Sequence, residues 1–173
     1  FAGFNVGGLS GDLKPVFEYN GGNRRVTLAG VTPTVEATQV GGTTYVRNPL
    51  GGFVQATGGD PLAAPVQALF AAPDTIMDNL VPISGTYTAA GSETVNGQQT
   101  TRYTTTTTLT DLGFINPALA GQGGTATTTI WVDNAQGYVV ALQSNIVPTQ
   151  GGATATARLD VTNVGQIPAI TAP

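Results

Sequence analysis

The chain has 173 residues and a mass of 17.5 kDa, a length typical of one domain that can bury a core. Only 9% of the residues are charged, the formal net charge is −4, and Lys14 is the single lysine. Because phosphate binding needs a basic surface, we expect no nucleic-acid partner. The sequence has no His and no Cys, which excludes disulfides, thiol and imidazole catalysis, and almost every transition-metal site.

The composition is that of a globular, turn-rich protein. Hydrophobic residues make up 40% of the chain, which also has 24 glycines and 11 prolines without a collagen-like period. The many threonines, the few Lys and Glu residues and the start at Phe1 suggest a secreted product whose targeting segment lies upstream. No stretch of 18 apolar residues predicts a membrane span, so any membrane attachment is expected upstream as well.

Residues 16–55 combine β-branched residues with glycine turns and predict short strands. Asn20-Gly21-Gly22-Asn23 and Gly41-Gly42 supply residues that tolerate the positive φ of a tight hairpin turn. Residues 48–52, with Pro49 and two glycines, predict a further turn. The predicted strands cover residues 16–19, 24–29, 33–40, 43–47 and 53–55.

The spacing of hydrophobic residues becomes helical between Asp60 and Leu80. Pro65 fits the first turn of one helix, and Pro73 interrupts the pattern, after which Asp74 fits the cap of a second helix. The sequence therefore predicts two short helices rather than one long helix. Their apolar stripe consists of Leu62, Val66, Leu69 and Phe70, continued by Ile76, Met77 and Leu80.

Strand character returns at Ile83, and threonine, which favours strands, is abundant up to residue 109. Turns are predicted at Gly91-Ser92 and at Asn96-Gly97, and residues 111–120 predict a short helix or a helical loop. Strands before and after a cluster of helices imply an α+β fold with one antiparallel sheet and the helices gathered on one face. The predicted strands here cover residues 83–89, 100–109, 125–132, 137–147 and 153–164.

No motif indicates an enzyme. Residues 121–126 match the loose dinucleotide pattern G-x-G-x-x-A, but they precede the strand of Trp131 instead of opening a helix, so we interpret them as a loop. Asp74 and Asp78 would share a helix face and could bind calcium or transfer protons, yet favourable interaction with the helix dipole explains both. The serines, Ser144 among them, have no histidine partner, and we expect no catalytic residue and no cofactor.

The apolar residues of the helical segments are the remaining candidate site. By default such residues form a core, but a sheet covered only by short, proline-broken helices need not close tightly, and the remaining space would be an apolar pocket. Both interpretations stay open. The candidate pocket residues are Leu62, Val66, Leu69, Phe70, Ile76, Met77, Leu80, Leu112, Phe114 and Ile115, with Leu119 beside them.

Several short sequence segments follow one another in an order of predicted strands, hairpins and helix. The segments are Gly41–Pro49 with Gly52–Val54 and Asp60–Leu62, Val95–Gly97 with Thr101–Tyr103, Trp131–Asp133 with Gly137–Val140, and Leu159–Gly165 with Ile170–Pro173. In this order they resemble the LppX/LprG-type bacterial envelope lipoproteins, relatives of the lipoprotein carrier LolA. The resemblance covers roughly residues 16 to 173.

This resemblance implies a strongly curved antiparallel half-barrel over residues 16–173, with short helices on its concave face and a hydrophobic cavity that holds acyl chains. It implies no catalytic residue. The family's anchoring cysteine is absent from this sequence, so a lipid anchor would be N-terminal and unseen. Residues 1–15 are expected to form a flexible arm or a partial first strand.

Two functions follow from these observations. The first is a non-enzymatic, lipoprotein-like domain of the cell envelope that binds or shuttles lipid acyl chains in an apolar cavity. The alternative is a structural or accessory subunit of an extracellular or membrane-bound assembly, since threonine-rich strands lose little solvation in protein contacts. Both place the protein outside the cytoplasm, in the periplasm or on the outer face of the membrane.

Overall fold

The computed structural model describes residues 4–6, 9–11, 14–29, 35–48, 51–57, 63–81, 85–115, 117–151 and 154–173. The chain divides into two compact units. The first unit consists of residues 1–73 and 165–173, and the second unit consists of residues 74–164. The chain therefore passes from one unit to the other at two points, after Pro73 and after Val164.

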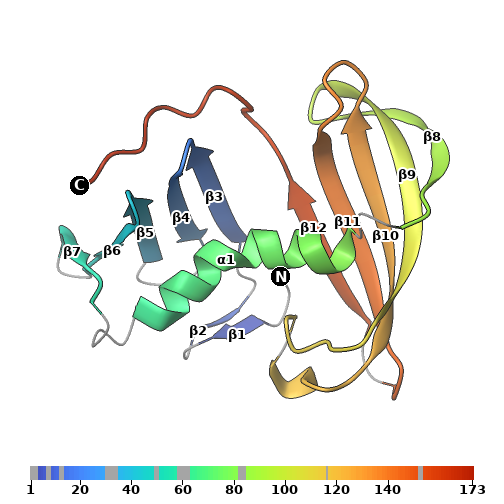
Figure 1. The fold of residues 1–173 in the computed structure, drawn as a ribbon, viewed down its shortest axis with the longest axis horizontal. Helices are drawn as coiled ribbons and strands as arrows, with labels where there is room; N and C mark the ends of the chain where they lie inside the picture. Colours follow the sequence, from blue (N-terminus) through green and yellow to red (C-terminus); the bar gives the residue numbers. More distant parts are fainter. Residues whose placement is uncertain are drawn as a thin grey trace. The chain divides into compact units, whose positions relative to one another are not determined.

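Two antiparallel sheets lie in the first unit (Figure 1). One is the pair β1–β2 within the segment expected to be an arm or partial strand, and the other is five-stranded with the order β3-β4-β5-β6-β7. The predicted strands and turns are confirmed here, and Gly41 and Gly42 have φ values of 56° and 82°. The strands are β1 (Phe4–Val6), β2 (Leu9–Gly11), β3 (Lys14–Asn20), β4 (Asn23–Ala29), β5 (Val35–Val40), β6 (Thr43–Arg47) and β7 (Phe53–Gln55).

A single helix, α1 (Ala63–Leu80), replaces the two short helices that the sequence predicts. Pro65 lies in its first turn as expected, but Pro73 lies inside the helix and Asp74 is an interior residue rather than a cap. Pro73 removes only one N–H from the helical hydrogen bonds. The helical residues before Pro73 pack in the core of the first unit, and those after it pack in the core of the second unit. We infer that this packing outweighs the loss of one main-chain hydrogen bond.

An arginine of β4 contacts the helix close to Pro73. Arg24 Nη1 donates a hydrogen bond of 3.3 Å to the main-chain oxygen of Phe70, in the turn that precedes the proline. The carbonyl that lacks a main-chain donor because of Pro73 is that of Leu69, four residues earlier, so Arg24 supports the neighbouring carbonyl and ties the helix to β4. The sequence pattern of the helix alone gives no sign of this contact.

The second unit holds a five-stranded antiparallel sheet, which we call the second sheet, with the order β12-β11-β10-β9-β8 (Figure 1). Residues 111–115 and 117–120 form the expected helical loop, which contains the short 3₁₀ helix η1 (Pro117–Leu119). The three closing strands are present, but the last one ends at Asp160 instead of Val164. The strands are β8 (Thr88–Val95), β9 (Gln98–Leu109), β10 (Gly124–Asp133), β11 (Val139–Pro148) and β12 (Ala155–Asp160).

The prediction of one sheet is wrong, because the strands form two five-stranded sheets and one two-stranded pair. In each five-stranded sheet every strand pairs with its neighbour along the chain. The two runs of strands are separated by α1, and short turns join strands only within a run. Local pairing is favoured because short loops cost less entropy to close.

The strand predicted over residues 83–89 is wrong in its bounds, because residues 85–87 lie outside any strand and β8 begins at Thr88. The predicted turn at Gly91-Ser92 is a β-bulge within β8 instead. The register passes from Ala89 opposite Tyr103 to Ser92 opposite Thr101, and Gly91 has a φ of 109°. A bulge needs the same left-handed backbone that a turn needs, so the glycine signal does not distinguish them. The neighbouring turn at Asn96-Gly97 is confirmed.

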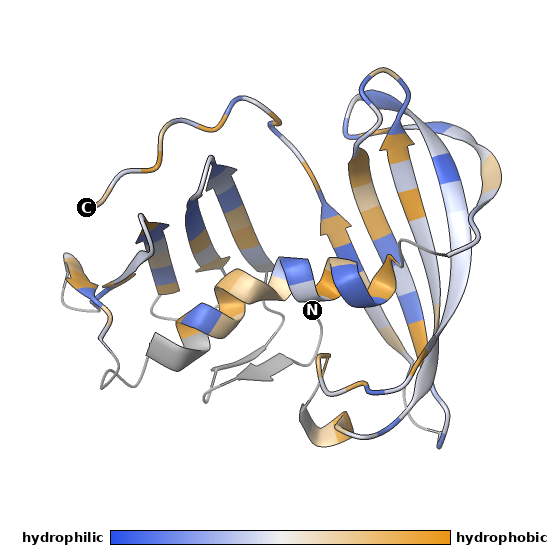
Figure 2. Ribbon diagram, viewed as in Figure 1, coloured by the Kyte–Doolittle hydropathy of each residue, from blue (hydrophilic) through white to orange (hydrophobic). Residues whose placement is uncertain are grey.

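Alternating burial builds a core on one face of each five-stranded sheet. Figure 2 shows hydrophobic and hydrophilic residues alternating along β10 and β11. In the first unit the core consists of Val26, Ala37, Val46, Val66 and Phe70. In the second unit it consists of Leu80, Leu109, Leu112, Ala126, Ile130, Leu142, Ile146 and Ala157.

A substitution in the Asn96-Gly97 turn tests the backbone geometry of the β8–β9 hairpin. Asn96 and Gly97 have φ values of 51° and 80°, as a two-residue hairpin turn requires. Gly97→Ala should lower the free energy of unfolding by about 1–2 kcal/mol, because a Cβ disfavours this backbone region. The measurement is urea unfolding of the purified variant.

Gly22→Ala is the matched control for this test. Gly22 lies in another hairpin turn and has no left-handed φ, and a Cβ added to it would have no neighbouring heavy atom within 4 Å. Its stability should stay within about 0.5 kcal/mol of the parent protein. Equal effects of the two substitutions would contradict the turn assignment.

Candidate functional site

Charged groups do not gather into a chemical site in the described part of the chain. No group of three or more Asp or Glu side chains there could hold a metal ion. Arginines and carboxylates instead pair across neighbouring strands or along one strand, and Asp74 and Asp78 are exposed on α1. The pairs are Arg25–Glu18 at 3.2 Å, Arg47–Glu36 at 2.7 Å, Arg102–Glu93 at 3.3 Å and Arg158–Asp160 at 2.8 Å.

The predicted pocket residues before Pro73 lie in the first unit. Val66 and Phe70 are 1% and 3% exposed and pack with the core of that unit. Leu69 is also buried but is not a member of that core cluster. Leu62 lies outside the described residues.

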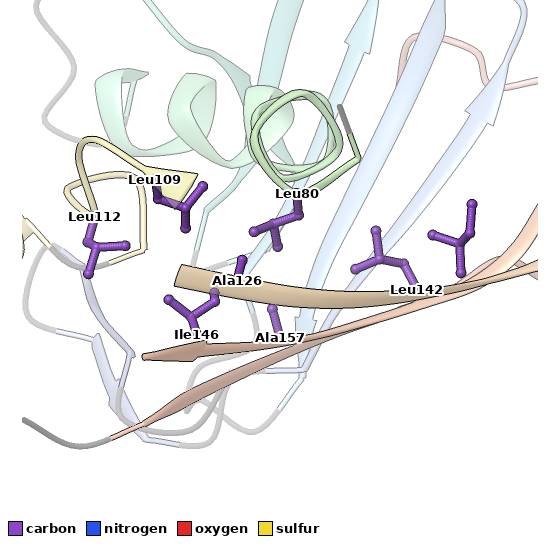
Figure 3. Close-up of a cluster of buried hydrophobic side chains, with 8 residues drawn as sticks. Leu80, Leu109, Leu112, Ala126, Leu142, Ile146 and Ala157 are labelled. Atoms are coloured by element: carbon purple, nitrogen blue, oxygen red, sulfur yellow. The ribbon is translucent and has the colours of Figure 1, made fainter. Parts of the chain in front are cut away.

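The predicted pocket residues after Pro73 lie in the second unit. Leu80 and Leu112 are fully buried members of its core, and Figure 3 shows both among the strand residues of the cluster. Ile76, Met77, Phe114 and Ile115 are partly buried and pack against that core. The described residues of the predicted set thus divide between two cores, one in each unit.

Sequence reasoning missed the contribution of the strands to the second core. Ala126 and Ile130 on β10 and Leu142 and Ile146 on β11 are at most 8% exposed. The alternation of hydrophobic and polar residues along these strands could have identified their inward face. Small and polar residues at some inward positions weaken this pattern. Two such residues, Thr128 and Ser144, are fully buried, and Thr128 Oγ1 donates a hydrogen bond of 3.0 Å to Ser144 Oγ.

The loop that carries Leu112 is fixed by a carboxylate. Asp111 Oδ1 accepts hydrogen bonds from the N–H groups of Gly113, at 2.7 Å, and Gly121, at 2.9 Å. The hydrogen bond from Gly113 and then that from Gly121 lower the pKa of Asp111 below its ordinary value. The Leu112 N–H donates to the main-chain oxygen of Gln122 at 2.9 Å, so the loop closes on itself.

The glycine-rich stretch before β10 has a packing role. A Cβ on Gly124 would lie 2.9 Å from the Val147 main-chain oxygen and 3.2 Å from Leu112 Cδ1. Only glycine fits there without a shift of the neighbouring strand or of Leu112. This stretch leads into a strand, in agreement with the rejection of a dinucleotide-binding loop.

Two comparisons with known proteins bear on this site. The model of the LppX_LprAFG lipoprotein family matches residues 2–166. None of the curated proteins compared with the chain matches it. Within the described residues, no helix has both the length and the apolar character needed to cross a membrane.

The Asp111 carboxylate generates a pH-dependent prediction. Its pKa is lower in the folded protein than in the unfolded chain, so its stabilising contribution is present above the unfolded value and disappears as the pH falls through the folded value. Asp111→Asn should therefore lower the thermal midpoint at pH 7, where the parent carboxylate is ionised. At about pH 2 the two proteins should unfold at similar temperatures.

Thermal unfolding followed by circular dichroism between pH 2 and pH 7 measures this difference. Asp78→Asn is a suitable control, since Asp78 is exposed on α1 and no hydrogen bond of its carboxylate is found among the described residues. A pH-independent difference between Asp111→Asn and the parent would show that the charge is not the stabilising feature.

Proposed function

The chain belongs to the LppX_LprAFG lipoprotein family, and on this basis we propose that it binds lipid acyl chains in an apolar cavity and shuttles them within the cell envelope. Membership indicates an envelope-associated, extracytoplasmic lipoprotein of a generally non-enzymatic family. The proposal includes an N-terminal lipid anchor. The observation that carries it is this family match over nearly the whole chain.

The chemistry of the candidate residues agrees with this function. An acyl chain needs neither a hydrogen bond nor a charge, and its binding energy comes from burial at about 0.8 kcal/mol per methylene. The candidate residues are all apolar, whereas four of the five arginines form ion pairs elsewhere on the sheets. Lipid binding of this kind requires no histidine, cysteine or metal ion.

The residues at the margin of the second core are best suited to contact a lipid acyl chain. Ile76, Met77, Phe114 and Ile115 pack against the buried cluster but remain partly exposed. Partly exposed apolar side chains gain most from a ligand that removes the remaining water. Met77 adds adaptability, because its unbranched thioether fills irregular spaces.

Native mass spectrometry of gently purified protein tests whether a lipid is bound. The proposal expects adducts with the masses of acyl lipids, which organic extraction then releases for identification. Repeated recovery of protein without any acyl species, together with failure to bind added fluorescent fatty acid, would contradict it.

The Met77→Trp variant distinguishes between two roles of Met77, as a residue that lines a binding cavity or as a residue of a closed core. If Met77 lines the cavity, the indole fills space that the acyl chain uses, so binding is lost and the free energy of unfolding changes by less than about 1 kcal/mol. In a closed core the same change would destabilise the protein by about 1–3 kcal/mol. Fluorescent fatty-acid binding and thermal unfolding of one preparation measure both effects.

Val147→Trp is the control for Met77→Trp. Val147 lies on β11, is 53% exposed, and does not belong to the second core. It should keep acyl binding and stability. Loss of stability in Met77→Trp with no lipid binding by the parent would overturn the assignment of Met77 to a cavity wall.

One structural feature favours the alternative, an accessory subunit of an assembly. β8 is an edge strand of the second sheet, and its residues from Thr88 to Thr94 are all exposed. An exposed edge offers main-chain hydrogen bonds to a strand from another protein. Sedimentation of the native envelope extract tests this function, which requires defined assemblies; a monomer that associates with nothing would count against it.

A further inference from the structure

Residues 165–173 pass the turn between β3 and β4 as a segment of irregular backbone (Figure 1). They belong to the first unit, although the strand before them, β12, belongs to the second unit. They form no strand of either sheet in the first unit. We call residues 167–170, with the sequence Ile-Pro-Ala-Ile, the docked segment.

Two asparagine side chains of one hairpin turn hold the docked segment by its main chain. Asn20 Nδ2 donates a hydrogen bond of 2.7 Å to the main-chain oxygen of Ile167, and Asn23 Nδ2 donates one of 2.8 Å to that of Ile170. Asn20 is the last residue of β3, and Asn23 is the first residue of β4. The turn therefore binds two carbonyl oxygens that are three residues apart.

The sheet itself fixes the orientation of the Asn23 amide. Asn23 Oδ1 accepts a hydrogen bond of 3.3 Å from the N–H of Gly41, which lies in the turn between β5 and β6. An amide whose oxygen is held in this way has its two N–H donors available for another partner. Asn23 is thus positioned by two neighbouring turns of the sheet.

The side chains of the docked segment follow the same three-residue spacing. Ile170 is 2% exposed and Ile167 is partly buried, whereas Pro168 and Ala169 between them are exposed. Pro168 fixes its own φ and disfavours helical backbone at Ile167. Because a polyproline-like backbone has three residues per turn, residues i and i+3 face the same side. The sequence therefore places both isoleucines on one side of the segment.

The docked segment is held by few contacts. Among the described residues these are the two side-chain hydrogen bonds and one fully buried side chain, that of Ile170, and there is no β-ladder. Residues 162–166, which lead to the segment from β12, are all exposed. Exposed segments with few buried contacts open at a low cost in free energy. The segment can therefore leave the turn without unfolding of the sheet.

We propose that the turn of residues 20–23 is a recognition site for an extended, proline-containing segment of a partner protein, and that the docked segment occupies it as an intramolecular competitor. The partner segment carries a branched apolar residue, a proline after it, and a second branched apolar residue three positions after the first. Recognition of this kind reads a pre-formed extended backbone and needs no charge. The ligand is a peptide and not a lipid, so the inference goes beyond the proposed function and does not depend on it.

The Ile170→Asn variant of the full chain tests whether the site binds a peptide once the docked segment is released. The probe is a fluorescent synthetic peptide with the sequence of residues 165–173. In the parent protein the docked segment competes at an effective concentration in the millimolar range, so the parent should bind the probe at least about tenfold more weakly than the variant. Fluorescence anisotropy measures both affinities, and circular dichroism checks the fold. The same peptide with the Ile170→Asn change is the control ligand and should not bind.

Asn20→Asp, added to the Ile170→Asn variant, tests the hydrogen-bond donor. It replaces the Nδ2 group with an oxygen of similar shape and should weaken binding of the probe about tenfold. Asn134→Asp in the same background is the matched control, because it introduces the same charge in the second unit, where the amide oxygen accepts a hydrogen bond from Thr101. It should leave the affinity for the probe unchanged.

Nuclear magnetic resonance of the isotope-labelled parent protein gives a readout that does not depend on the folding of any variant. An excess of unlabelled peptide at millimolar concentration should displace the docked segment. The main-chain signals of Ala169 and Ile170 should then move toward the values of an unstructured chain, while the signals of β10 stay in place.

Three results would overturn the proposal. The first is a folded Ile170→Asn variant that does not bind the probe, and the second is binding that Asn20→Asp leaves unchanged. The third is sedimentation of the parent protein as a dimer that the peptide dissociates, since a second copy would then supply the segment in place of a different partner. None of these results bears on the binding of acyl chains, which is measured separately.

Discussion

Each five-stranded antiparallel sheet of this protein has one apolar face, and that face must be covered for the sheet to be stable in water. A single α-helix in the described part of the chain contributes to both coverings. Val66 and Phe70 of α1 belong to the core of the first unit, and Leu80 belongs to the core of the second. This constraint explains why the helix continues through Pro73, since packing on either side favours helical backbone at the proline.

Because charged residues are scarce, ligand binding by this protein depends on the burial of apolar groups. With 9% charged residues and no histidine or cysteine, the chain has few groups that could perform chemistry, and four of its five arginines are engaged in ion pairs. What remains to bind a ligand is hydrocarbon surface and hydroxyl groups. Such a surface agrees with the family to which the chain belongs.

Strands and turns were well predicted because their signals are local. β-branched runs bounded by Asn-Gly or Gly-Gly specify hairpins through backbone geometry alone, as at Asn96-Gly97. The bulge at Gly91 was not predictable, since whether a left-handed glycine reverses the chain or only offsets the register depends on the opposing strand. The helix through Pro73 was missed because the packing of Val66 and Phe70 before it and of Leu80 after it is tertiary information.

The burial of the helical residues was predicted in part, and a cavity lined by them stays a prediction. Helical spacing identified Val66, Phe70 and Leu80, whose burial the structure confirms. It could not identify Ala126, whose small side chain contributes little to a hydrophobic pattern, or Ser144, whose polarity suggests an exposed position. Their inward placement follows from the register of three adjacent strands, which is tertiary information.

Photo-crosslinking with a diazirine-bearing acyl ester, followed by peptide mapping, tests the central claim most directly, because it locates the bound chain on the protein. The account predicts saturable labelling of residues 74–81, of the 109–115 segment and of the inward positions of β10 and β11. Labelling confined to exposed positions such as Val147, or labelling that an excess of unlabelled ester does not suppress, would contradict it.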